Sequence, residues 1–141
     1  MLKESFKNFF RNKFAITAIA ASFLLNIAGI LLLKFNIDFN KALIILHYNS
    51  YLGIDRVVYD SENVWLQVYA VSFSALAVSF LNIFLAFFLY HAAFRFSNKK
   101  NKEKDLRQNP RFLAAVILLG ASLALQIIVL LYTISIVLVN G

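Results

Sequence analysis

Three carboxamide side chains are the polar groups that this sequence places deepest in apolar surroundings. Asn26, Asn82 and Gln126 each lie near the middle of a long apolar run that contains no Asp, Glu, Lys or Arg. At about 1.5 Å per helical residue, all three lie roughly 18–21 Å from the charged end of their run. Amides at one depth can hydrogen-bond across helix interfaces, and they can also bind a polar solute or an ion. We expect helix packing first and a polar binding site second.

A second polar group lies between the first two apolar runs. His47, Asn49 and Asp55 carry side chains that bind ligands or metals, and Tyr48 and Gly53 lie among them. A metal site needs more strong ligands at regular spacing. Asn and Asp also hydrogen-bond turn backbones, so loop structure is the simpler interpretation. We expect these five residues to be candidate contacts for a partner, with no metal.

Catalytic chemistry finds no support in the sequence. There is no cysteine, no His-Glu-x-x-His, no Gly-x-Ser-x-Gly and no Walker-type glycine loop. Ser72, Ser74 and Ser79 lie in an apolar run, but a serine nucleophile needs a base at its own depth. No acidic or basic residue shares the depth of the amides, which disfavours a proton relay. We therefore expect a protein that is not an enzyme and uses no cofactor.

Three uncharged runs at 14–33, 64–94 and 112–140 must position these groups. About 20 apolar residues suffice for a helix to span a bilayer. The chain of 141 residues is 61% hydrophobic and only 15% charged, whereas soluble domains are about a quarter charged. The sequence thus predicts an all-α membrane protein with three transmembrane helices, arranged as a single membrane domain over 1–141. The first run is too long for a signal-peptide core, so we expect it to be retained.

The segments outside the spans also carry structural signals. Residues 2–13 predict a short amphipathic helix at the membrane interface, because apolar residues recur on one helical face: Leu2, Phe6, Phe9 and Phe10. The outer segment 34–63 contains β-prone runs at 42–48 and 56–59, and Gly53 can supply the turn of a small hairpin. Asn109 and Pro110 are typical of a helix start, so they open the third span. His91, near the charged end of the second run, should reach toward the interface.

The charge distribution predicts the orientation of the chain. Of the 14 basic residues, 11 lie in 1–13 and 95–111, two segments separated by two crossings, and the net charge is +7. This is the positive-inside pattern, which predicts a cytoplasmic N-terminus and an external C-terminus. We expect contact with anionic lipid headgroups and no nucleic-acid binding. The residues expected to set topology and meet headgroups are Lys3, Lys7, Arg11, Lys13, Lys99, Lys100, Lys102, Lys104, Arg107 and Arg111.

Small residues four apart favour close helix approach. The pairs are Ala18 and Ser22, Ala70 and Ser74, Ala75 and Ser79, and Gly120 and Ala124. They fit either packing within the chain or association with a partner.

The outer segment resembles a known membrane family. His47-Tyr48-Asn49, followed by Gly53 and Asp55, resembles the His-aromatic-Asn-x-x-Gly-x-x-Asp stretch in the domain of unknown function of SdpI-like membrane proteins. Gly53 stands one place late and Ile45 replaces the family's proline. Residues 46–55 are also similar to a Leu-His-Tyr-Asn-x-Tyr-x-Gly-Ile-Asp loop of uncharacterised small bacterial membrane proteins. The first resemblance implies toxin immunity, and both imply a bacterial source.

These observations favour a non-enzymatic structural, interaction or accessory subunit of a bacterial inner membrane, with a membrane-protein partner or a second copy of itself. One alternative is toxin immunity or envelope sensing through the outer segment. Another is a small oligomeric pore or transporter, which requires the three amides to line a wet path.

Overall fold

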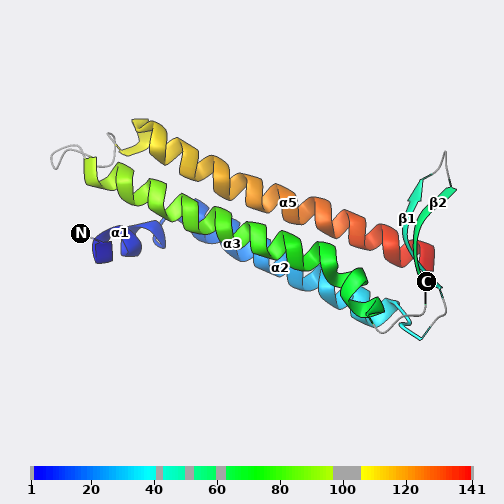
Figure 1. The fold of residues 1–141 in the computed structure, drawn as a ribbon. Helices are drawn as coiled ribbons and strands as arrows, with labels where there is room; N and C mark the ends of the chain where they lie inside the picture. The colour runs from blue at the N-terminus through cyan, green and yellow to red at the C-terminus, as the bar shows by residue number, and fades with distance from the viewer. Residues whose placement is uncertain (1, 41–42, 50–52, 60–62, 97–105, 141) are drawn as a thin grey trace. The chain divides into compact units, whose positions relative to one another are not determined.

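The computed structural model describes residues 2–40, 43–49, 53–59, 63–96 and 106–140, with only the backbone at 47–49, 53–55 and 59 (Figure 1). The elements in chain order are α1 (Leu2–Phe9), α2 (Lys13–Asn36), β1 (Leu43–Asn49), β2 (Gly53–Tyr59), α3 (Val64–Phe96) and α5 (Pro110–Asn140).

Three helices among the described residues are long and apolar enough to cross a membrane, which confirms the three predicted spans. Helices α2, α3 and α5 contain 24, 33 and 31 residues. At about 1.5 Å per residue they measure roughly 36, 50 and 46 Å, against a hydrocarbon core of about 30 Å. These lengths are those of a multi-pass membrane protein, in which α3 must tilt or extend beyond the core.

Asparagine side chains set two of the helix starts. The Oδ1 atom of Asn12 accepts hydrogen bonds from the backbone N–H groups of Phe14 (3.0 Å) and Ala15 (3.4 Å), which caps α2. The predicted helix over 2–13 therefore ends at Phe9, because Asn12 starts the next helix instead of continuing the first. At α5, Asn109 Oδ1 accepts from the N–H of Arg111 at 3.0 Å, as the Asn-Pro pattern predicts.

The chain forms two compact units, and parts of α2, α3 and α5 belong to each. The first comprises Met1–Phe23 and Ala77–Leu125. Its core is rich in small side chains, which let helices approach closely in lipid: Ala15, Ala18, Ala86, Ala93 and Ala115. Phe9 of α1 is 1% exposed and makes edge contacts with the rings of Phe87 and Tyr90. Helix α1 is thus packed on α3.

A hydrogen bond adds to this packing of α1. The Ser5 hydroxyl is fully buried and lies 3.0 Å from Nδ1 of His91. The His91 ring thus contacts α1 through Ser5 and stacks on Phe87, while its reach toward the membrane interface stays a prediction.

The second unit comprises Leu24–Leu76 and Gln126–Gly141, and includes the strands. Its core joins one face of the sheet to the helices: Leu33, Ile37, Ile44, Leu46, Val58, Val64, Val68 and Ile136. Strands β1 and β2 pair antiparallel, with Ile44 opposite Val58. Gly53 was predicted to supply the turn, but it is the first residue of β2 and pairs with Asn49.

Two irregularities interrupt the pairing of the strands. In β1, Ile45 pairs with Val57 and His47 pairs with Arg56, so Leu46 is an extra residue. In β2, Asp55 is the extra residue between Ile54 and Arg56. Such a bulge leaves backbone groups without a ladder partner.

Candidate functional site

Two of the predicted amides meet inside the second unit. Asn26 and Gln126 are 2% and 1% exposed. Asn26 Nδ2 donates to Gln126 Oε1 at 3.0 Å and to the backbone carbonyl of Ser72 at 3.1 Å. Gln126 Nε2 donates to the carbonyl of Ala75 at 3.1 Å. A helical carbonyl has a second lone pair, so it can accept these bonds without losing its own helix partner.

This arrangement links three helices through three hydrogen bonds. Both N–H groups of the Asn26 amide have protein acceptors, so they are engaged in packing α2 against α3 and α5 within the second unit. No acidic or basic side chain takes part. The geometry therefore suits helix adhesion rather than proton transfer.

Asn82 does not join that network. It belongs to the first unit, is half-buried, and makes no hydrogen bond within the described part of the chain. The similar depth predicted for the three amides is thus not accompanied by a hydrogen bond from Asn82 to Asn26 or Gln126.

The outer candidates lie on the two strands. The register sets His47 opposite Arg56, Tyr48 opposite Ile54, and Asn49 opposite Gly53. Asp55 is the extra residue of β2 between Ile54 and Arg56. The side chains of these five candidates lie outside the described residues, so their contacts stay predictions.

The sheet is fixed to α5 by two residues that sequence reasoning missed. Asn140 Oδ1 accepts from the N–H of Ile45 at 2.7 Å, and its Nδ2 donates to the Ile45 carbonyl at 2.6 Å. The Tyr132 hydroxyl donates to the carbonyl of Leu46 at 3.1 Å, which satisfies the bulge residue. The signal for Asn140 was present in the sequence, because a lone amide ends an otherwise apolar run.

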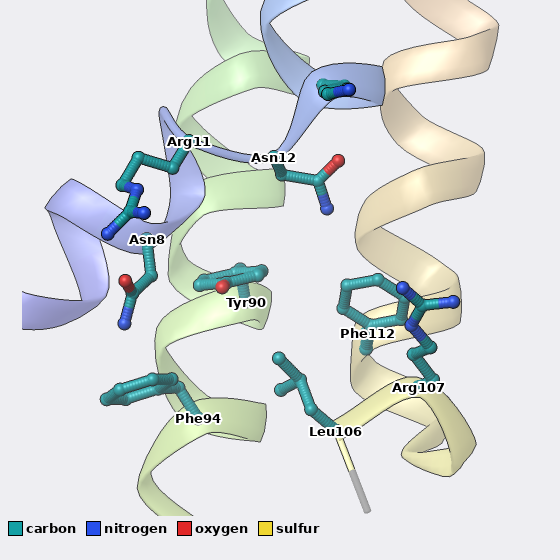
Figure 2. A pocket seen from close by; sticks show the side chains of 9 residues that line it. Asn8, Arg11, Asn12, Tyr90, Phe94, Leu106, Arg107 and Phe112 are labelled. Atoms are coloured by element: carbon teal, nitrogen blue, oxygen red, sulfur yellow. The ribbon is translucent and has the colours of Figure 1, made fainter. Parts of the chain in front are cut away.

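A cavity of about 640 Å³ lies in the first unit, lined by polar side chains and by Phe94, Leu106 and Phe112 (Figure 2). Several of the residues predicted to meet lipid headgroups are exposed in the first unit: Lys3, Lys7, Arg11, Lys13, Arg107 and Arg111. Arg11, Lys13 and Arg107 line the cavity, whereas the guanidinium of Arg111 lies 4.9 Å from the ring centre of Phe96. Lys99, Lys100, Lys102 and Lys104 lie outside the described residues.

No group of three or more His, Asp or Glu residues that could hold a metal ion occurs within the described ranges. No known family model, curated protein or solved structure matches this chain.

Proposed function

We propose that this protein is a non-enzymatic accessory or structural subunit of a bacterial inner membrane that associates with another membrane protein through an outward face of α5. One observation carries the proposal. A side chain added at Gly120 would meet nothing within 4 Å, and Ala124, four residues on, is exposed. Glycine and alanine at this spacing permit close helix approach, but no described helix of this chain uses the opening at Gly120.

Two of the other small pairs provide the contrast, whereas Ala70 and Ser74 on α3 are exposed as well. Ala18 and Ser22 are buried, as are Ala75 and Ser79, so these pairs serve packing within the chain. On α5, large side chains beside the open pair face outward, with Ile117 70% and Leu131 62% exposed. A small notch bordered by large apolar groups is suited to receive a ridge of another helix.

The proposed orientation has the N-terminus in the cytoplasm and the C-terminus outside, with β1 and β2 forming an outer hairpin. The support is the concentration of basic residues in 1–13 and 95–111. The absence of charged residues from the runs 14–33, 64–94 and 112–140 supports a role without proton chemistry.

The test is affinity capture of the tagged full chain from gently solubilised native membranes, with Gly120→Leu as the decisive variant. Because the space beside Gly120 is empty, leucine should leave the fold intact while blocking a partner helix. We expect recovery of the partner to fall at least tenfold. Ser135→Leu places the same side chain at another exposed position of α5 and should leave recovery within twofold. Unchanged recovery with Gly120→Leu would refute the proposed face.

A second candidate is toxin immunity or envelope sensing through the outer sheet. The supporting observation is the double hydrogen bond from Asn140 to Ile45, which holds β1 in a defined position next to the candidate residues. Replacing His47, Asn49 and Asp55 together with alanine should then abolish protection against the toxin without reducing membrane insertion. Protection that survives the triple change would exclude this role.

A further inference from the structure

The cavity of the first unit is lined by hydrogen-bond donors from three separate segments. Asn8 belongs to α1, Arg11 and Asn12 connect α1 to α2, and Lys13 begins α2. Tyr90 comes from α3, and Arg107 precedes α5. Figure 2 shows the labelled side chains arranged around one space, with Tyr90 projecting from α3. The volume of about 640 Å³ is within the range of small-molecule sites.

The described lining is positively charged. It contains three cations and no carboxylate. Arg11 and Lys13 make no ion pair with any described residue, so their charges are available to a ligand. Two cations at one cavity, Arg11 and Lys13, that make no ion pair with a described residue favour an anion there.

The cap of α2 orients a further donor. Asn12 Oδ1 is held by the N–H groups of Phe14 and Ala15, so its Nδ2 points the other way. Figure 2 shows that nitrogen directed into the cavity, above Tyr90. The amide thus presents two N–H donors and no acceptor to whatever occupies the space.

Tyr90 supplies an independent observation. It is only 5% exposed and lines the cavity, yet its hydroxyl makes no hydrogen bond with any described residue. Ser122 Oγ is the buried side-chain polar atom without a partner among the described residues, so the Tyr90 hydroxyl is open to the cavity. It can therefore donate to a ligand acceptor there.

An apolar groove of about 610 Å³ lies beside α1 and α3. Phe6 and Phe9 of α1 and Phe10 after it line the groove, together with Phe84 and Phe87 of α3. The segment 6–13 therefore lines both a cationic space and an aromatic one. That combination matches a molecule with a charged head and a hydrocarbon tail.

We propose that the cavity binds a phosphate group at the membrane surface. Phosphate oxygens are acceptors only, which suits a lining of guanidinium, ammonium, amide and hydroxyl donors. Two sources share this chemistry: the headgroup of an anionic phospholipid and a soluble phosphate ester. The adjoining aromatic groove favours the phospholipid.

The experiment uses the full chain in neutral nanodiscs and measures binding of phosphatidylglycerol by native mass spectrometry. The decisive variant is Arg11→Gln with Lys13→Gln, and its matched control is Lys3→Gln with Lys7→Gln. Both double variants remove two positive charges from the same region, but Lys3 and Lys7 do not line the cavity. We expect at least a tenfold loss of affinity in the first and less than twofold in the second. Equal losses would reduce the effect to general surface charge and overturn the proposal.

Tyr90→Phe keeps the test decisive should the charge variants fold poorly. It removes only the unpaired hydroxyl, so we expect an unchanged unfolding midpoint with a threefold or greater loss of phosphatidylglycerol affinity. Wild-type affinity in this variant would contradict the proposed site.

A second arm identifies the source of the phosphate. Inorganic phosphate and glycerol 3-phosphate are titrated against the bound lipid. Phosphatidylglycerol binding that neither anion displaces supports a lipid headgroup, and displacement at millimolar concentration supports a soluble ester. No binding of any of the three probes overturns the proposal.

Discussion

Replacing Asn26 and Gln126, singly and together, tests how the second unit holds its helices. Asn26→Ala removes the bonds to Gln126 and to the Ser72 carbonyl, both about 3 Å long. Gln126→Ala removes the same shared bond and the bond to the Ala75 carbonyl. Each single change thus deletes two of the three described bonds and leaves a buried amide with an unmet partner.

The magnitude follows from hydrogen bonds measured between membrane helices, which average about 0.6 kcal/mol and reach about 1.7 kcal/mol. Two lost bonds lower the free energy of unfolding by about 1–3 kcal/mol in each single variant. The double variant loses the three described bonds. The two single variants together lose four, because the bond between Asn26 and Gln126 is lost in each of them. The loss in the double variant should therefore fall short of the summed single losses by about 1 kcal/mol.

The assay is reversible unfolding of the full chain in mixed micelles by titration with sodium dodecyl sulfate, monitored by circular dichroism. Asn82→Ala is the matched control, because this amide is half-buried and makes no hydrogen bond with described residues. We expect its unfolding free energy to stay within about 0.5 kcal/mol of wild type. Strictly additive losses, or an equal loss in the Asn82 variant, would refute the reasoning.

Three further changes test separate contacts. Ser122→Ala should leave the unfolding free energy within about 0.5 kcal/mol in the same titration, because this buried hydroxyl has no hydrogen-bond partner within the described structure; a loss above about 1 kcal/mol would reveal a partner. Asn140→Leu removes both hydrogen bonds to Ile45 at nearly constant size, so amide exchange at Ile45 should accelerate at least tenfold, and unchanged exchange would count against this attachment of β1. Phe9→Ala removes the ring contacts between α1 and α3 and should lower the free energy of α1 packing by about 3 kcal/mol, which is measured as faster proteolysis within 2–9. Wild-type cleavage rates would show that these contacts do not hold α1.

The spans could be predicted because charge-free apolar runs of this length are typical of helices that cross a bilayer. The hydrogen-bond partners of the three amides could not be predicted. Spacing along a helix gives the depth of Asn82 relative to Asn26, but it does not say which way each side chain points. Helices α2 and α3 are apolar all round, so the sequence offers no polar face from which to infer direction.

Local signals decided the segment ends, and one of them was overlooked. The apolar spacing continues through Phe10, which favoured a helix to residue 13, yet Asn12 is a strong capping residue and ends that pattern. The cavity lay beyond prediction for a different reason. Arg11 and Arg107 were expected at headgroups from their charge alone, and only the folded first unit brings them around one space with Tyr90.

The attachment of β1 to α5 has a consequence for synthesis. Asn140 follows Ile45 by 95 residues, and Tyr132 follows Leu46 by 86. A chain emerging from the ribosome therefore contains both strands long before the residues that hold them have been made. Ile45 and Leu46 of β1 lack these hydrogen-bond partners until the last helix has been synthesised, and an unpaired strand edge is prone to pair with other chains during that interval.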